Sequence, residues 1–266
     1  MELWENLNNI SKKLEELLKI KVEDSDCIEN AIKNAKIEKA EWNKVENVVA
    51  IFADLKNSTI ISNRKIKRVY AKFLESIGYP FSKICKLFDA KFIDIKGDGG
   101  IALFQGQYAE IKAFLAAETY KTFQEQYIKP IFEKNYNVNY SFGIGIAKGD
   151  LLVKKVGSRN YSFFVWAGDT INNAALISKD VKEIDSNTNT SKIGISLEIY
   201  ESLSNPKFEE YLIYSCGCPN GNKELLWKER HLKNGKGMKY KYIESNWCNE
   251  HGEEYLNKVL NNIKES

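Results

Sequence analysis

Long apolar runs, proline and net charge are all scarce in this 266-residue sequence. No apolar stretch reaches the ~18–20 residues that a membrane-spanning helix needs, so we expect no membrane partner. The four prolines and the lack of a serine- and glycine-rich stretch argue against flexibly joined domains. The 39 basic and 36 acidic residues leave a net charge of +3, with lysines scattered among acids. That pattern lacks the basic footprint of a nucleic-acid-binding protein.

Cysteine is also sparse, and its count of five is odd. The first residues, Met1–Glu5, lack the basic region and apolar run that begin a secretory signal. Disulfide frameworks belong to oxidising compartments and use cysteines in even numbers. We therefore expect a reducing, cytoplasmic setting.

The N-terminal residues show the apolar periodicity of a helix. Leu3, Leu7, Ile10 and Leu14 repeat at helical spacing within residues 2–20, and a second helix is expected at about 26–39. We interpret residues 1–44 as an N-terminal helical arm for packing or dimerisation.

The rest of the chain alternates short strands with helices around one substantial core. A strand at 45–55 is followed by a helix at 63–77, which Gly78-Tyr79-Pro80 is expected to end, and by a short helix at 81–88. The other expected strands are 91–95, 101–104, 138–148, 150–156 (pairing back on 138–148), 163–166, 192–196, 210–215, 225–231 and 238–243. The other expected helices are 108–133, 168–178, 197–204 and 252–263. This order predicts an α+β fold with a ferredoxin-like, mainly antiparallel sheet packed with helices. The core is predicted at 45–205, and residues 206–266 are predicted to complete it.

Two aspartates stand at the ends of apolar runs in this core. Asp54 follows Phe52-Ala53, and Asp98 lies in Lys96-Gly97-Asp98-Gly99-Gly100, whose Asp-Gly pair between apolar runs predicts a hairpin. Together with the Leu55 carbonyl, the two carboxylates offer the hard oxygen ligands that Mg²⁺ or Mn²⁺ prefers. Taken singly, each aspartate is more simply a helix cap or a turn residue.

A polar segment follows the first aspartate directly. Asn57, Ser58 and Thr59 are expected to open the next helix, where free N–H groups and the positive end of the helix dipole would bind a triphosphate.

Three motifs in order resemble the class III nucleotidyl cyclases. They are Phe52-Ala53-Asp54-Leu55 with Ser58-Thr59, then Lys96-Gly97-Asp98, then Trp166-Ala167-Gly168-Asp169-Thr170-Ile171-Asn172-Asn173-Ala174-Ala175. The resemblance covers roughly residues 45–180. It implies a phosphorus–oxygen lyase in which Asp54 and Asp98 bind two metal ions. It also implies a homodimer with composite sites, in which Asn172 of the other chain orients the ribose of a nucleoside triphosphate.

The sequence departs from this family at the positions that read the base. Asp94 stands where adenylate cyclases have lysine and guanylate cyclases glutamate, and Val165 occupies the second base-reading position. Asp94 is an acceptor that can take N3–H of uracil, N4–H of cytosine or a guanine edge. A carboxylate flanking a hairpin is the simpler alternative.

The family's transition-state arginine is missing as well, since Leu176 occupies its position. Lys179, on roughly the same helix face, and Arg159, in the preceding hairpin, are the candidate replacements. Each of them is otherwise an ordinary solvated charge.

These departures and the C-terminal segment are most similar to the bacterial Pycsar pyrimidine cyclases. That resemblance implies conversion of UTP or CTP to cyclic UMP or cyclic CMP in antiphage defence, with a separate effector that reads the cyclic nucleotide. A purine cyclase, or a catalytically silent nucleotide-binding dimer, is the alternative.

One further constellation lies in the C-terminal segment. Cys216, Cys218, Cys248 and His251 form a candidate Cys3His zinc site. Because Cys-x-Cys is a less usual zinc spacing than Cys-x-x-Cys, the sequence favours a reduced structural cluster instead.

Overall fold

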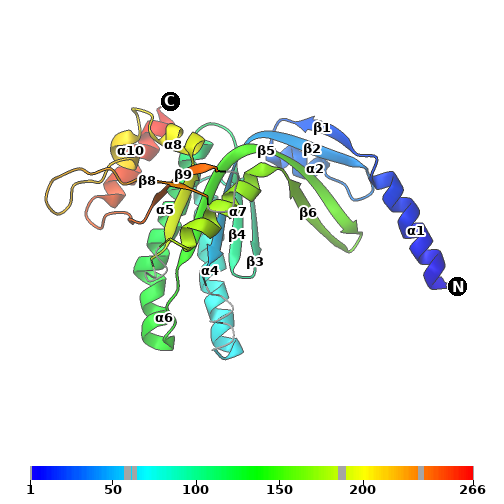
Figure 1. Ribbon diagram of the computed structural model, residues 1–266, viewed down its shortest axis with the longest axis horizontal. Helices are drawn as coiled ribbons and strands as arrows, with labels where there is room; N and C mark the ends of the chain where they lie inside the picture. The colour runs from blue at the N-terminus through cyan, green and yellow to red at the C-terminus, as the bar shows by residue number, and fades with distance from the viewer. Residues whose placement is uncertain (1, 57–60, 62–64, 185–189, 233–236, 266) are drawn as a thin grey trace. The chain divides into compact units, whose positions relative to one another are not determined.

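The computed structural model describes residues 2–56, 61, 65–184, 190–232 and 237–265 (Figure 1). Its helices are α1 (Glu2–Leu17), α2 (Ile28–Asn34), α4 (Lys67–Leu87), α5 (Ala109–Phe123), the π-helix η1 (Gln124–Ile128), α6 (Lys129–Tyr136), α7 (Asp169–Lys182), α8 (Leu197–Leu203), α9 (Glu209–Leu212) and α10 (Gly252–Lys264). Its strands are β1 (Lys21–Ser25), β2 (Glu41–Leu55), β3 (Phe92–Lys96), β4 (Gly99–Phe104), β5 (Phe142–Ser158), β6 (Tyr161–Ala167), β7 (Lys192–Ser196), β8 (Lys228–His231) and β9 (Lys239–Ile243). No described helix is both long and apolar enough to cross a membrane.

The chain divides into two compact units. The larger unit, Val48–Lys148 with Thr170–Ser266, holds a sheet in the order β3-β4-β2-β5-β7-β9-β8. The pairs β2–β4, β3–β4, β7–β9 and β8–β9 are antiparallel, whereas β5–β7 is parallel. Within this unit α4 and α5 lie side by side, with α6 continuing from α5 (Figure 1). The predicted α+β fold with a mainly antiparallel sheet is confirmed.

The smaller unit consists of Met1–Asn47 and Gly149–Asp169. Here β1, which the sequence did not predict, pairs in parallel with the start of β2. Residues 152–158 pair with β6. The expectation that residues 150–156 fold back on 138–148 was wrong, because β5 runs unbroken through both stretches.

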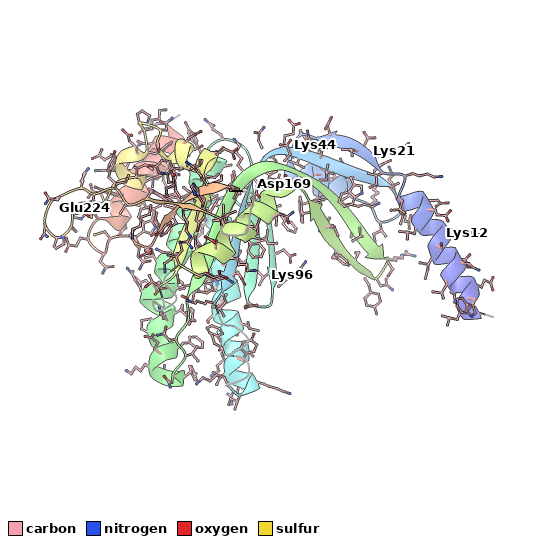
Figure 2. All side chains as sticks on the ribbon, in the orientation of Figure 1. Lys12, Lys21, Lys44, Lys96, Asp169 and Glu224 are labelled. Atoms are coloured by element: carbon pink, nitrogen blue, oxygen red, sulfur yellow. The ribbon has the colours of Figure 1, made fainter. Side chains whose placement is uncertain are left out.

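Helix α1 forms as its periodicity predicts, and its apolar side is exposed. Leu3, Trp4 and Ile10 are each more than 60% exposed. Figure 2, in which Lys12 is labelled, shows side chains projecting along the whole helix.

Helix α4 runs through Pro80, so the expected break at Gly78-Tyr79-Pro80 was wrong. Proline lacks the N–H that would bond the carbonyl four residues earlier, here that of Ser76. The Gln124 side-chain amide donates to the Ser76 carbonyl instead, at 2.9 Å. Phe73, Ile77 and Phe81 are buried at helical spacing on both sides of the proline, and their packing favours one continuous helix.

Two other expectations were also corrected. The helical stretch expected at 108–133 continues to Tyr136, with Pro130 in the first turn of α6, where a missing N–H costs little. Residues 210–215, expected as a strand, begin with the short helix α9. Phe208 and Leu212 are both buried and four residues apart, which is the spacing of one helix face.

Helix α7 lies against β5 at Gly143 and Gly145, where the strand has no side chains. A Cβ atom at Gly143 would lie 2.0 Å from the Ser178 carbonyl oxygen, and one at Gly145 would lie 1.9 Å from the Ala174 carbonyl oxygen. The Ser178 hydroxyl also donates to the Gly143 carbonyl at 2.8 Å. The helix backbone therefore rests directly on the strand.

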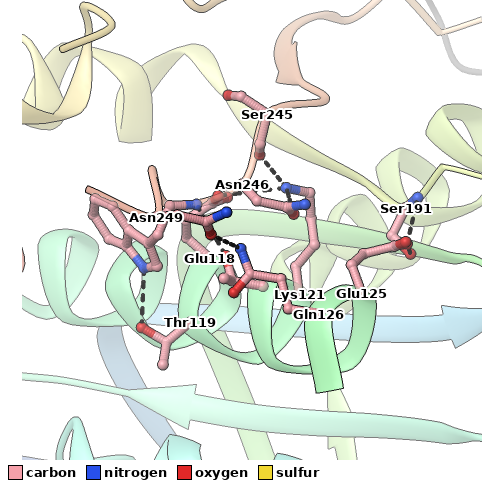
Figure 3. A network of polar contacts seen from close by, with 11 residues as sticks. Glu118, Thr119, Lys121, Glu125, Gln126, Ser191, Ser245, Asn246 and Asn249 are labelled. Carbon is pink, nitrogen blue, oxygen red and sulfur yellow. Dashed lines mark hydrogen bonds and ion pairs between the residues drawn. The ribbon is translucent and has the colours of Figure 1, made fainter. Parts of the chain in front are cut away.

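The C-terminal segment between β9 and α10 is held against α5 by polar contacts (Figure 3). Lys121, which is fully buried, donates to the Ser245 carbonyl and, at 2.8 Å, to Asn246 Oδ1. It also forms an ion pair at 3.4 Å with Glu118, whose Oε2 has no hydrogen-bond partner among the described residues. Lys121 is thus the counter-charge of a buried carboxylate and an anchor for the tail.

Replacing Lys121 by methionine leaves Glu118 buried without a counter-charge. We expect the free energy of unfolding to fall by roughly 3–5 kcal/mol, the usual cost of breaking a buried ion pair. The matched control is Lys112→Met on the same helix, whose 3.1 Å ion pair with Asp89 is partly solvent-exposed and should contribute less than about 1 kcal/mol. Urea unfolding followed by circular dichroism measures both. Equal losses in the two variants would contradict the assignment.

Gly145→Ala places a methyl group in the space that the α7 backbone occupies. We expect a loss of about 1–3 kcal/mol or more, because a carbonyl oxygen cannot rotate away as a side chain can. Gly78→Ala is the control: its nearest atom lies at 3.4 Å, and alanine suits a helix interior better than glycine. Thermal unfolding of both variants separates the two cases, and an unchanged melting temperature for Gly145→Ala would refute the close contact.

Candidate active site

The two predicted metal-binding aspartates meet at one rim of the larger unit's sheet. Asp54 is the penultimate residue of β2 and stands opposite Gly99 of β4 in the antiparallel register. Asp98 immediately precedes Gly99, in the two-residue turn between β3 and β4. Gly97, the first turn residue, has φ = 63°, the left-handed conformation that such a hairpin needs. Lys96, labelled in Figure 2, marks the end of β3 beside this turn.

Both carboxylates are half-buried, and Leu55, the last residue of β2, is buried. The structure therefore brings all three predicted ligand residues to one place, Asp54 and Leu55 by sequence and Asp98 by strand pairing. Carboxylate and carbonyl oxygens together make the hard donor set that Mg²⁺ and Mn²⁺ require, so these residues fit such ions. Their role as ligands stays a prediction.

Lys182 belongs to this site, although sequence reasoning missed it. Its ammonium forms an ion pair with Asp54, and its side chain is only 14% exposed. A Cβ at Gly143 would lie 2.3 Å from Lys182 Cγ, so the bare strand surface gives the lysine its path across β5. In the structure Lys182 is one helical turn beyond Ser178, the residue that packs on Gly143, so both lie on the same face of α7.

The C-terminal part of α7 is fixed from its other side by Asp180. This carboxylate accepts hydrogen bonds from Arg230 Nε of β8 at 2.8 Å and from the Tyr240 hydroxyl of β9 at 2.6 Å. Burial, together with the bond to Asp180, raises the pKa of Tyr240, and the bond to Asp180 raises the pKa of Arg230. Because Asp180 lies two residues before Lys182, these bonds position the lysine as well.

Asn172, Leu176 and Lys179 occupy a different face of α7. They are spaced at i, i+4 and i+7, and all three are exposed. By contrast, Ala174 and Ser178 are buried against β5. Within one chain, the predicted ribose and transition-state residues thus face solvent, while Lys182 reaches Asp54.

The remaining predicted site residues fall elsewhere. Arg159 is exposed in the turn between β5 and β6, and Val165 lies in β6 opposite Lys154, both in the smaller unit. The predicted phosphate-binding residues Asn57, Ser58 and Thr59 lie outside the described residues.

Asp94 lies in β3, on the hairpin that carries Asp98. It pairs in register with Ile101 of β4, and its carboxylate lies 3.2 Å from Lys96 Nζ. Its side chain is one-third exposed and that of Lys96 is 71% exposed, so this surface ion pair is weak and can be exchanged for another partner.

Comparison with known proteins identifies the family. Residues 40–215 match the family model described as the adenylate and guanylate cyclase catalytic domain. A uridylate cyclase from Micromonospora echinofusca is 32% identical over 236 residues, which cover 86% of this chain and 74% of that protein. A uridylate cyclase from Propioniciclava tarda is 29% identical over 234 residues, covering 84% and 72%.

Solved cyclase structures share the fold at much lower identity. The adenylyl cyclase CyaB from P. aeruginosa matches with a TM-score of 0.59 and 14% identity, over 79% of this chain and 98% of that one. A bacterial light-regulated adenylyl cyclase matches with a TM-score of 0.58 and 12% identity, over 81% and 98%. The family model, the relatives and the aspartate pair agree: the chain is a class III nucleotidyl cyclase, a lyase of the adenylate and guanylate cyclase catalytic domain family.

Proposed function

We propose that this cyclase is pyrimidine-specific and converts UTP or CTP into 3′,5′-cyclic UMP or cyclic CMP plus pyrophosphate. The observation that carries the proposal is the placement of Asp54, opposite Gly99, and of Asp98, next to Gly99, at one rim of the sheet, in a chain similar over 84–86% of its length to proteins named uridylate cyclase. The reaction joins the substrate's 3′-oxygen to its own α-phosphorus and breaks the bond from that phosphorus to pyrophosphate.

Asp54, Asp98 and the Leu55 carbonyl would hold two Mg²⁺ or Mn²⁺ ions, as is typical of the family. Bound there, the ions would lower the pKa of the attacking hydroxyl and neutralise charge on the departing pyrophosphate. Asn57, Ser58 and Thr59, which follow directly in sequence, are proposed to bind the phosphates.

Asp94 is proposed to contact the base, and the family resemblance makes Val165, in the smaller unit, the second proposed base-reading residue. An acceptor at Asp94 suits the N3–H of uracil or the N4–H of cytosine, and it lacks the cation with which a lysine would contact adenine. Asp94 and Asp98 lie four residues apart on one hairpin, so the same element would place the base and the metals.

The site is proposed to be completed by a second copy of the chain. Asn172 is exposed on α7, on the face turned away from β5, as a residue that serves a partner's site must be. The exposed apolar side of α1 gives an arm that can bury surface in a homodimer. The cyclic product would act as a second messenger in antiphage defence, read by a separate effector.

The substrate is tested by incubating the purified chain with each of the four nucleoside triphosphates and Mn²⁺, with products separated by chromatography. We expect cyclic UMP or cyclic CMP as the main product, and a loss of at least ~100-fold for Asp54→Asn and for Asp98→Asn. Product mainly from ATP or GTP would establish a purine cyclase instead. Binding of UTP without turnover, unchanged by Asp54→Asn, would establish a silent nucleotide-binding dimer.

The cation that replaces the missing arginine can be identified by comparing Lys182→Met, Lys179→Met and Arg159→Met. We expect Lys182→Met to lower kcat by roughly 10–100-fold, because it removes a positive charge beside Asp54 where phosphate charge develops. Lys179→Met is the comparison on the same helix, since Lys179 is exposed on the face that also carries Asn172.

Rates measured at saturating UTP and Mn²⁺ decide between these cations. A larger loss of kcat for Lys179→Met or Arg159→Met than for Lys182→Met would assign the role to that residue, as the sequence first predicted. Circular dichroism of each variant checks that the fold is retained.

A further inference from the structure

Three cysteines and one histidine converge in the C-terminal part of the larger unit. The three Sγ atoms and a ring nitrogen of Cys216, Cys218, Cys248 and His251 all lie within 4.8 Å of one another. His251 Nδ1 is 3.2 Å from Cys218 Sγ and 3.9 Å from Cys248 Sγ. None of the three cysteines forms a disulfide.

These separations are close to those of a tetrahedral zinc site. Zinc binds thiolate sulfur at about 2.3 Å and imidazole nitrogen at about 2.0–2.1 Å, which puts neighbouring ligand atoms about 3.5–3.8 Å apart. A disulfide would use only two of the three sulfurs and would leave the histidine without a role.

The local backbone is shaped to bring the ligands together. Gly217, between the first two cysteines, has φ = 86°, so this unusual Cys-x-Cys spacing closes as a tight turn. A Cβ there would lie 2.8 Å from the Gly221 carbonyl carbon. On the other side, the Gly252 amide donates to the Cys248 carbonyl at 2.8 Å, which folds Cys248 back toward His251.

Packing alone does not account for the cluster. Cys216, Cys248 and His251 are half-buried and Cys218 is exposed, whereas the metal-independent Cys85 is fully buried in the apolar core. A cavity of about 120 Å³ lies directly beside the cluster, lined by Cys216, Cys248 and His251 among others. Thiolates and an imidazole around one metal would cross-link the segments that border this cavity.

We propose that Cys216, Cys218, Cys248 and His251 bind one structural Zn²⁺ ion, separate from the metals of the cyclase site. The four protein ligands fill a tetrahedron and leave no position for substrate, which marks the site as structural. On binding, each thiol loses its proton to solvent, and Glu250 Oε2, 3.3 Å from Cys218 Sγ, loses the S–H donor that it has without metal.

The ion would tie two parts of the chain together. One is the loop of residues 214–225, closed by the Tyr214–Leu225 bridge and by the Ser215 amide bonded to the Glu224 carbonyl at 2.8 Å; Glu224 is labelled in Figure 2. The other is the start of α10, preceded by Trp247, whose indole donates to Thr119 of α5 at 3.2 Å. Zinc would thereby fix the tail that Lys121 also anchors.

Metal analysis of the full chain tests the proposal without any measurement of cyclase activity. We expect the chain, purified under reducing conditions without chelator, to hold about one zinc per chain by plasma mass spectrometry. The variants Cys218→Ser and His251→Ala should hold less than ~0.2 zinc per chain. Cys27 is a half-buried cysteine outside the cluster, so the Cys27→Ser variant should hold as much zinc as the unaltered chain. Chelation should lower the melting temperature of the unaltered chain and not that of His251→Ala.

Co²⁺ exchange decides the case even if a variant fails to fold. Adding one equivalent of Co²⁺ to the chelator-treated, reduced chain should give thiolate charge-transfer absorption and the visible bands of tetrahedral cobalt. Absence of zinc from the purified chain, together with no such bands and equal reactivity of all exposed thiols with and without Zn²⁺, would overturn the proposal. Loss of zinc with cyclase activity retained would leave the proposed function intact and identify the site as purely structural.

Discussion

The contact between α7 and the glycine surface of β5 is the constraint on which the site depends. Because Gly143 and Gly145 have no side chains, the helix backbone sits at a distance that a Cβ would forbid. That proximity lets Lys182 reach Asp54 and turns Asn172 toward solvent on the opposite side. A helix held a few ångströms further out would leave Asp54 without its counter-charge and would shift those residues of the third motif that α7 carries, Asn172 among them. The Asp180 bonds to β8 and β9 keep the helix from rotating.

Those parts of the site that depend on local structure could be predicted from sequence. Asp54 follows an apolar strand and Asp98 occupies a turn with a glycine signature, so their meeting requires only that neighbouring strands pair. Lys182 could not be found in this way, since its partner is 128 residues away and the contact depends on how α7 sits on β5. The alternating glycines Gly143 and Gly145 are visible in the sequence, but which side chain crosses them is not.

The errors in secondary structure have the same origin. Pro80 reads as a helix end because proline removes a hydrogen bond, and the compensating Gln124 side chain lies 48 residues beyond Ser76, whose carbonyl it contacts. Residues 210–215 are a short apolar segment whose pattern fits either a helix or a strand. Phe208 and Leu212 are buried on one face, and this burial favours the helix. Local sequence propensity thus gave the wrong secondary structure where contacts with distant residues changed the free-energy difference between the alternatives by a few kcal/mol. The four proposed zinc ligands were found by residue type, but only their convergence in space favours a metal over a reduced cluster.

The bond between Gln124 and the Ser76 carbonyl has an evolutionary consequence. The buried side-chain amide of Gln124 makes a second hydrogen bond, because its Oε1 accepts from the Tyr140 hydroxyl at 2.9 Å. A lineage that replaced Gln124 first would bury an orphan carbonyl at a cost of about 1–3 kcal/mol, whereas one that replaced Pro80 first would regain the helical N–H. The order of substitution is therefore constrained, and positions 80 and 124 should change together among relatives even though they lie on different helical segments.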